Sequence, residues 1–392
     1  MDRLYSKNIS EDQIADSLSS IRNTESKIRF IHASDLHLGS HQYRSEERAK
    51  DFTLALKQIL DLALNHQVSF IILGGDVFTS LEILPVHLTE IVSVLSDFKE
   101  KTRNFIPIIA IEGNHDIRKF SKGVKFSKRG QSWLKFIASL DLIILLGANF
   151  NVNPEKMFQP YNFKTRKGGK IRIGNVMIYG VRYLGQTLGM EQFRRISSGI
   201  DPNDGLFHIL IQHFGIKGQM KNVPGVNYLN LNPLKDRVNY LALGHYHLQF
   251  VIDKWVFNPG SSEAVSSVDH SFKRGIFLVE IQDDHTAKVA SIRLKNRDVL
   301  IESIIIEKSI NKWEAFEDFI IKRLKDRIER EETKELKFPV LYLTLKGIKP
   351  SKKCNIDLNK LKIKILSSFP IIDVTIYQKY SSPEILIHNF LS

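Results

Sequence analysis

Three apolar runs in the first third of the chain end abruptly in polar residues, and no other feature constrains the fold as strongly. The runs IRFIHAS, FIILGG and IPIIAIEG are followed by Asp35, Asp76 and Asn114. Amphipathic stretches of helical length, residues 46–65 and 85–101, separate them. Strands that alternate with such helices form βαβ units, in which helices cover a largely parallel sheet. Ligands bind at the carboxyl ends of such strands, so these polar residues mark a candidate site.

The second half of the chain repeats this layout with shorter strands and little helix. Its segments are KIRIGNVMIYGVRY, LFHILIQHFG, VNYLALGHYH and WVFNPGSS. We therefore predict an α/β protein whose core is a two-sheet α/β sandwich, with both sheets contributing loops to one edge.

The length of 392 residues allows two or three domains. After residue 285 the sequence changes to strands around LIESIII and FPVLYLTLKG, with helices at 311–330 and 358–368. We predict an N-terminal extension over residues 1–26, formed by a short helix or a tail. A core domain over 27–285 and a smaller α+β C-terminal domain over 286–392 complete the prediction.

Cysteine usage limits the kinds of site that the chain can build. The single cysteine, Cys354, excludes a disulfide framework and a cysteine-based zinc ribbon. Any metal must therefore be held by His, Asp, Asn or Glu. No segment approaches the roughly 18 consecutive apolar residues that a membrane-spanning helix requires. These features predict a soluble, cytoplasmic protein that is not exported.

Seven potential metal ligands stand at the ends of the predicted strands. They are Asp35, His37, Asp76, Asn114, His213, His245 and His247. Asp35 and His37 are two residues apart, as are His245 and His247, so on an extended strand end each pair points to one side and could chelate one ion. Seven ligands are too many for one tetrahedral ion, whereas two ions about 3.5 to 4 Å apart could share Asp76. Oxygen and nitrogen ligands without thiolate suit manganese, iron or zinc.

Each of these residues also has a simpler interpretation. A lone histidine near a strand end is more often structural, and a lone aspartate after glycine usually belongs to a turn. Five such clusters in order, each at a strand end, favour the metal site.

Two metal ions would support in-line attack of water on phosphorus, which predicts phosphoester hydrolysis. His115 follows Asn114, so its side chain should leave on the other side of the chain, where it could orient the phosphate or protonate the leaving oxygen. Asp116 could orient the His115 ring, although a capping role is equally consistent with its position.

These motifs resemble the calcineurin-like metallophosphoesterase superfamily, whose pattern is D-x-H, G-D, G-N-H-D, H and G-H-x-H. Within it the chain is most similar to the SbcD-like DNA-repair nucleases, the Mre-type subunit that partners an SMC-like ATPase of the Rad type. The segments that carry the resemblance are HASDLHLG, IILGGDVF, IAIEGNHD, ILIQHFG, LALGHYH and FNPGSSEA. It covers roughly residues 27–380, because the C-terminal domain is similar to the family's DNA-capping domain.

By this resemblance the seven residues match ligand positions for two divalent ions, expected to be manganese, and His115 matches the catalytic histidine. The resemblance implies exonuclease and endonuclease action on DNA ends in double-strand-break repair, by a homodimer in the nucleoid. Many archaeal and eukaryotic members have histidine where this chain has Thr79. A hydroxyl cannot carry a proton as imidazole does, so exonuclease action is less securely implied than phosphodiester cleavage. Only SSPEILIHNFLS follows the last predicted strand, where members usually continue into an ATPase-binding helix.

Charge suggests where DNA would lie. The chain carries 56 Lys+Arg against 43 Asp+Glu, a net charge of +13, which favours polyanionic partners. Two runs without acidic residues, 118–135 and 156–182, each contain seven basic residues. The candidate DNA contacts are Tyr43, Arg44, Thr79, Arg118, Lys119, Lys122, Lys125, Lys128, Arg129, Lys167 and Arg182. A solvated surface is the simpler interpretation of any charge run.

Two other functions remain open from the sequence. One is a phosphodiesterase or phosphatase of the same superfamily that acts on nucleotides or phosphoproteins. The other is a scaffold that binds DNA ends with an idle site.

Overall fold

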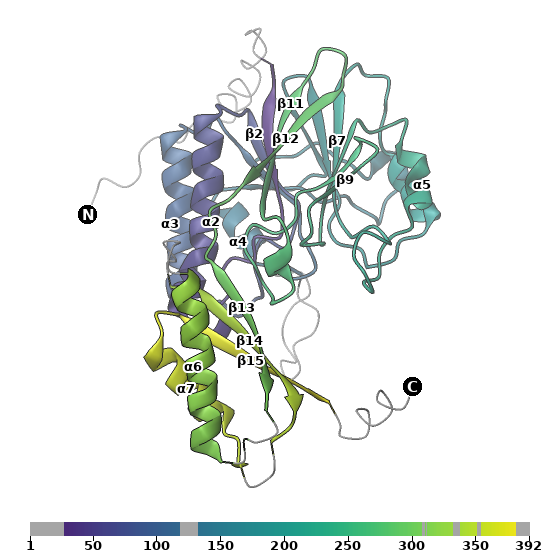
Figure 1. Cartoon of the computed structure of the whole chain (residues 1–392). Coiled ribbons are helices and arrows are strands. Elements are labelled where there is room, and N and C mark those ends of the chain that lie inside the picture. The colour runs from purple at the N-terminus through teal and green to yellow at the C-terminus, as the bar shows by residue number, and fades with distance from the viewer. Residues whose placement is uncertain are drawn as a thin grey trace, which may run out of the picture. The chain divides into compact units, whose positions relative to one another are not determined.

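The computed structural model describes residues 27–117, 132–307, 310, 312–331, 338–350 and 354–381. The chain divides into two compact units (Figure 1). The first unit comprises Met1–Ser40 and Ala49–Lys295, and the second comprises His41–Arg48 and Asn296–Ser392.

The first sheet of the first unit has six strands in the order β12-β11-β1-β2-β3-β4. Their bounds are β1 Arg29–Ala33, β2 Phe70–Leu73, β3 Ile108–Ala110, β4 Ile144–Leu145, β11 Gly275–Ile281 and β12 Ala287–Arg293. Strands β1 to β4 are parallel, and β11 and β12 extend the sheet in antiparallel pairing. The carboxyl ends of β1, β2 and β3 therefore lie at one edge, as the sequence pattern predicts.

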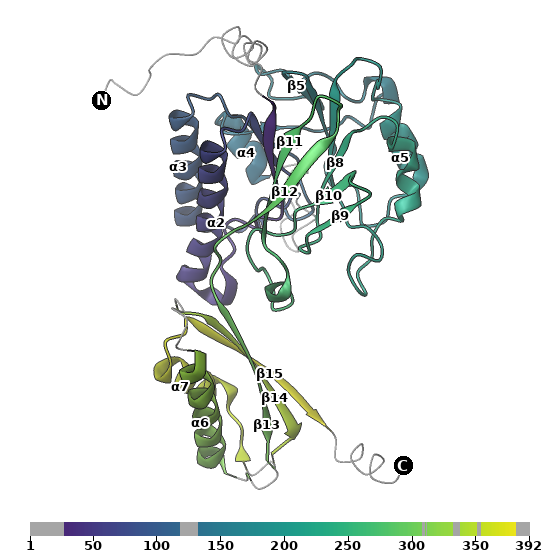
Figure 2. The same cartoon turned by 45° about the horizontal axis from the view of Figure 1, so that its top comes forward.

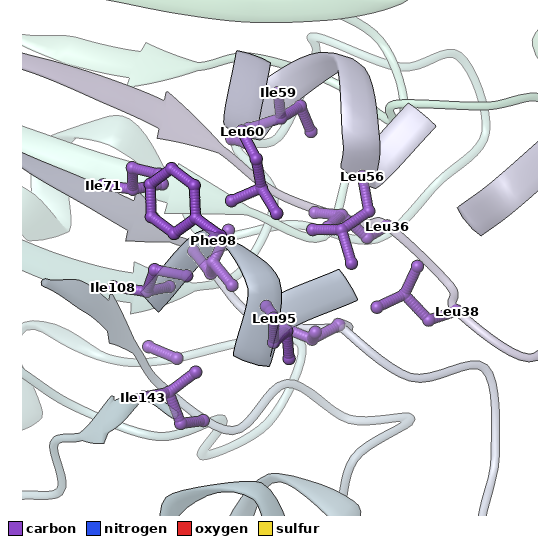
Figure 3. Packing of buried hydrophobic residues seen from close by; sticks show 14 of the residues in the cluster. Leu36, Leu38, Leu56, Ile59, Leu60, Ile71, Leu95, Phe98, Ile108 and Ile143 are labelled. Carbon is purple, nitrogen blue, oxygen red and sulfur yellow. The ribbon is translucent and has the colours of Figure 1, made fainter. Parts of the chain in front are cut away.

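Helices α2 Glu46–Asn65, α3 Pro85–Lys101 and α4 Trp133–Ser139 belong with this sheet. In both views α2 and α3 run side by side (Figures 1 and 2). Leu56 and Leu60 of α2 and Phe98 of α3 are buried in one apolar cluster with the strand residues Ile71 and Ile108 (Figure 3). The helical periodicity of these residues is what buries one face of each helix.

The second sheet has the order β5-β6-β7-β8-β10-β9. Its strands are β5 Lys170–Ile173, β6 Val176–Gly180, β7 Phe207–His213, β8 Tyr240–Gly244, β9 Phe250–Ile252 and β10 Val256–Asn258, and α5 Met190–Ser197 follows β6. The described residues also include the 3-10 helices Gln42–Arg44, Pro154–Lys156, Tyr228–Leu234 and Asp269–Ser271.

Alternation along β1 shows how the two sheets form a sandwich. Ile31 and Ala33 belong to the cluster that the helices cover, whereas Phe30 belongs to a second cluster with residues such as Ile178 and Ile209 of the other sheet. Successive strand side chains point to opposite faces, so each strand of the first sheet contributes to both cores. The predicted two-sheet α/β sandwich is confirmed.

The second unit contains the elements β13 Val299–Ile306, α6 Trp313–Glu331, β14 Val340–Ile348, α7 Leu358–Ser368 and β15 Asp373–Ser381. All three strands are parallel, in the order β13-β14-β15, and both helices cover the same face of the sheet (Figure 2). We predicted a boundary after residue 285, but β12 lies beyond it and pairs with β11 along its whole length. That strand therefore belongs to the first unit. No helix in the described part of the chain is long and apolar enough to cross a membrane.

Candidate metal centre

Loops from both sheets meet at the carboxyl ends of their strands. The loop after β1 is bound to the loop after β2, because Asp35 N–H donates to the Gly75 carbonyl at 3.0 Å and His37 N–H donates to the Asp76 carbonyl at 3.0 Å. The second sheet joins them through His245, whose N–H donates to the Asp35 carboxylate at 3.0 Å. Backbone hydrogen bonds thus bring three loops into one site before any cofactor is considered.

Six of the seven predicted ligands form two groups, each with one ligand atom per residue within 4.8 Å of the others. The first triad is Asp35, His37 and His247, and the second triad is Asp76, His213 and His245. The seventh residue, Asn114, lies at the second triad: its Oδ1 is 2.9 Å from His245 Nδ1 and 3.2 Å from His213 Nε2. The structure therefore brings all seven residues together.

The two predicted pairs of residues are placed differently. Asp35 and His37 share the first triad, whereas His245 and His247 are divided between the two triads. The prediction assumed extended strand ends, but Asp35, His37 and His245 have φ values of 51°, 48° and 93°. Neither pair therefore has the assumed extended backbone, and only the first pair falls within one triad.

Hydrogen bonds fix which ring nitrogen of two histidines faces the site. His213 Nδ1 lies 2.8 Å from the Gly74 carbonyl, which only accepts, so Nδ1 carries the proton and Nε2 faces Asp76. His247 Nδ1 lies 2.8 Å from the Asp269 carboxylate and is the donor for the same reason. In each ring Nε2 is left as the atom that can bind a cation.

The donor set fits divalent metal ions. His37 Nε2 and His247 Nε2 face each other at 3.2 Å. When both atoms are unprotonated, the form in which imidazole binds a metal, neither can donate to the other. A cation held with the Asp35 carboxylate would bind both of them. Carboxylate and imidazole are ligands for manganese, iron and zinc.

Backbone strain concentrates at the site. Asp35, His37, Asp76 and His245 all have positive φ values, between 47° and 93°. Such conformations cost of order 1 kcal/mol each in residues other than glycine and cluster at functional sites. Gly113 shows how tightly the loops pack, because a Cβ there would lie 2.2 Å from the Asp76 backbone nitrogen.

Burial and neighbouring charges set the pKa values of the candidate ligands. It lowers the pKa of His37 to about 3 and that of His245 to about 4, so both rings are neutral near pH 7, the form that binds metals. Burial alone would raise the pKa of the Asp76 carboxyl, but nearby His213 and His37 outweigh it and hold that pKa below its ordinary value. Burial alone would lower the pKa of His213, but the charge of Asp76 outweighs it and raises that pKa to about 9. A cation that binds between these two residues therefore displaces a proton.

His115 stands beside the ligands on an exposed position. Its ring centroid is 4.9 Å from that of His37, and its backbone N–H donates to Asp76 Oδ1 at 2.7 Å. The ring Nδ1 lies 2.8 Å from the Thr79 carbonyl and must donate to it. Nε2 is therefore the ring atom left to exchange a proton with a bound molecule.

Of the two roles considered for Asp116, orienting the His115 ring or capping, its contacts match the second, because its carboxylate binds backbone N–H groups. The His115 ring is held by Thr79, whereas the Asp116 carboxylate accepts from the backbone N–H groups of Val77 at 3.3 Å, Phe78 at 2.9 Å and Gly113 at 2.9 Å. Burial, followed by the charge of Asp76, raises the pKa of Asp116 to about 7. Its contacts join the loops that follow β2 and β3.

Sequence reasoning missed two residues of the site. Asp269, in the 3-10 helix Asp269–Ser271, is buried and holds His247. Tyr183 lies with its ring centroid 6.0 Å from that of His213 and 5.9 Å from that of His245. Tyr183 stands at the polar end of an apolar run, the signal that identified the ligands, whereas nothing local marks Asp269.

The predicted DNA contacts have mixed outcomes. Arg118, Lys119, Lys122, Lys125, Lys128 and Arg129 lie outside the described residues. Lys167 and Arg182 are exposed, and Arg182 directly precedes Tyr183. Thr79 contributes its carbonyl to His115. Tyr43 belongs to the second unit with Arg44, and its hydroxyl contacts that of Tyr342.

Comparisons with known proteins agree with this geometry. The family described as calcineurin-like phosphoesterase matches residues 28–249, more than half of the chain. Three proteins named DNA double-strand break repair protein Mre11 are similar. That of Sulfurisphaera tokodaii is 24% identical over 82% of this chain and 74% of its own, and that of Sulfolobus acidocaldarius is 22% identical over 87% and 80%. That of Archaeoglobus fulgidus is 28% identical over 60% of this chain and 50% of its own.

Proposed function

Because the chain belongs to the calcineurin-like phosphoesterase family, we propose that it is a metal-dependent DNA nuclease that processes DNA ends in double-strand-break repair. The observation that carries the proposal is the pair of ligand triads beside His115. The names of the similar Mre11 proteins support DNA as the substrate. We propose exonuclease and endonuclease activity, with two manganese ions as the cofactor.

The proposed reaction is hydrolysis of a phosphodiester bond. When bound, two divalent ions supply Lewis-acid activation of water and neutralise charge on the phosphate. The two triads and Asn114 would hold these ions. The strained backbone fixes the ligands in advance, so little ordering remains to be done when substrate binds.

His115 is the proposed catalytic residue. Its Nδ1 proton is fixed by the Thr79 carbonyl, so Nε2 is available to hold a proton for the leaving oxygen or to donate a hydrogen bond to the phosphate. The backbone bond from His115 to Asp76 ties this ring to the second triad. Thr79 acts here through its carbonyl, a group that every residue has, so this contact does not depend on a histidine at that position.

DNA binding is proposed for the basic runs and for the second unit. Exposed Lys167 and Arg182 and the candidates within 118–129 would neutralise phosphates, which makes binding strongly salt-dependent. We also propose a homodimer, association with an SMC-like ATPase of the Rad type, and action in the nucleoid. The apolar residues of α2 and α3 that pack on the first sheet are already buried within the unit, so a dimer would use other residues of these helices.

The test is cleavage of end-labelled linear DNA and of closed circular DNA with Mn²⁺, for the wild type and for His115→Asn. We expect Mn²⁺-dependent cleavage by the wild type, loss of at least about 100-fold in rate for H115N, and unchanged DNA binding and unfolding temperature in the variant. Cleavage that persists in excess chelator contradicts the metal mechanism, and full activity of H115N contradicts its role.

The same assay separates the two alternatives. Faster turnover of a small aryl phosphodiester or a nucleotide than of DNA would identify a phosphodiesterase of the same family. DNA-end binding with no hydrolysis of any ester would identify a scaffold.

A further inference from the structure

The loop that carries His247 is held by Asn258, at the end of β10, and by residues between β10 and β11. Asn258 Nδ2 donates to the carbonyls of Tyr246 at 2.7 Å and Leu248 at 2.8 Å, on either side of His247 in the sequence. Ser261 N–H donates to the His247 carbonyl at 3.1 Å. These bonds explain the FNPGSS segment structurally: it positions the backbone of one ligand.

Asp269 completes this support at the side chain. Its Oδ2 lies 2.8 Å from His247 Nδ1, and the same oxygen accepts from the N–H groups of Val265 at 3.0 Å and Ser266 at 3.0 Å. Only 4% of Asp269 is exposed. The carboxylate is therefore fixed by its own backbone contacts and cannot easily turn away from His247.

The two triads differ in how their histidines are supported. His213 of the second triad donates Nδ1–H to a neutral backbone carbonyl, whereas His247 of the first triad donates to a buried carboxylate. His245 Nδ1 faces an amide oxygen of Asn114. Within the described residues, a carboxylate outside the two triads thus supports a ligand ring in the first triad alone. A carboxylate partner makes the opposite ring nitrogen a stronger donor and fixes the ring orientation.

We propose that Asp269 is a positioning residue that strengthens metal binding at the first triad and so makes the two metal positions unequal in affinity. This inference rests on the proposed metal centre. Asp269 acts through His247 and does not itself contact the metal or the substrate.

The test is calorimetric titration of metal-free protein with Mn²⁺ alone, comparing the wild type with Asp269→Asn and Asp269→Ala. The wild type should bind two equivalents. In D269A one equivalent should weaken by about 10- to 100-fold while the other is unchanged. D269N keeps the size and one oxygen acceptor but removes the charge, so its loss should be smaller.

The chain offers a matched control in Asp204, whose Oδ1 lies 2.7 Å from Nε2 of buried His208. This pair stands at the start of β7, whereas His213 is at its end. Asp204→Ala removes the same kind of carboxylate–imidazole contact at a pair outside the two triads. It should leave both Mn²⁺ equivalents as in the wild type.

The possible outcomes distinguish a failure of the role inferred for Asp269 from a failure of the proposed metal centre. If the wild type binds no Mn²⁺, both the metal centre and the role of Asp269 are overturned. If the wild type binds two equivalents and both Asp269 variants do the same with unchanged affinity, only the inference is overturned. The inference is also overturned if the affinity for both Mn²⁺ equivalents falls and the unfolding temperature of the metal-free variant falls too, because Asp269 then has a general structural role.

Discussion

At the scale of single residues, His32 lies fully buried on β1 with both ring nitrogens bonded. Nε2 is 3.0 Å from the Leu243 carbonyl, and Nδ1 is 3.0 Å from the Tyr240 hydroxyl. The carbonyl only accepts, so Nε2 carries the proton and Nδ1 accepts from Tyr240. Burial lowers the pKa of His32 to about 3. The folded protein therefore holds this ring neutral throughout the range in which an exposed histidine titrates.

This arrangement predicts a stability loss in mild acid. Between the unfolded pKa of about 6.5 and the folded value the unfolded chain binds the extra proton, so the contribution is present above pH 6.5 and falls as pH decreases. Between pH 7.5 and pH 5 the wild type should lose about 2 kcal/mol more unfolding free energy than His32→Gln, which cannot titrate. Urea unfolding at both pH values measures this, and equal losses in the two proteins would exclude the effect.

The residue scale also shows what the sequence can predict about the site. All seven ligand candidates come together because their signal is local: a suitable side chain where an apolar run ends. The sequence did not show that His245 and His247 lie in different triads, because the path of each loop depends on backbone angles that no residue type dictates. Asp269 was missed because it lies 22 positions after His247, with β9 and β10 between them, and a carboxylate in a polar segment carries no distinguishing pattern.

At the scale of elements, Asp116 fastens together the loops that end β2 and β3. Asp116→Ala leaves three buried backbone N–H groups without their acceptor, so the unfolding free energy should fall by about 3 kcal/mol. The affinity of the second triad for Mn²⁺ should fall too, because Asp76 and Asn114 belong to these loops. Asp141→Asn, which removes a surface ion pair with Arg166 and keeps a residue that tolerates the positive φ of this position, is the control and should cost under about 1 kcal/mol. Equal unfolding free energies in the two variants would refute this role.

The bounds of helices could be predicted from the sequence where the apolar periodicity and the residues that end a helix agree. Helices α2, α3 and α7 have the predicted bounds because each carries a continuous apolar stripe. The predicted domain boundary after residue 285 preceded β12, which alternates exposed and half-buried residues at a sheet edge. Its assignment depends on pairing with β11, and pairing between strands has no periodic signature in one strand alone.

At the scale of the whole molecule, the chain enters the second unit twice. Residues 41–48 belong to it although residues 40 and 49 belong to the first unit. Tyr43 anchors this segment, with its ring centroid 6.2 Å from that of Tyr342 on β14 and the two hydroxyls in contact. The segment begins four residues after His37 in the sequence.

This connection predicts a local effect of a distant substitution. Tyr342→Ala in the full chain removes the ring on which Tyr43 rests, so residues 41–48 should exchange their amide hydrogens faster, while β1 and β7 keep wild-type protection. Ile305→Ala, on the neighbouring strand β13 at a position that is 69% exposed, is the control and should leave the segment unchanged. Hydrogen exchange read by mass spectrometry measures all three proteins. Equal exchange of residues 41–48 in the wild type and Y342A would mean that contacts other than this tyrosine pair hold the segment.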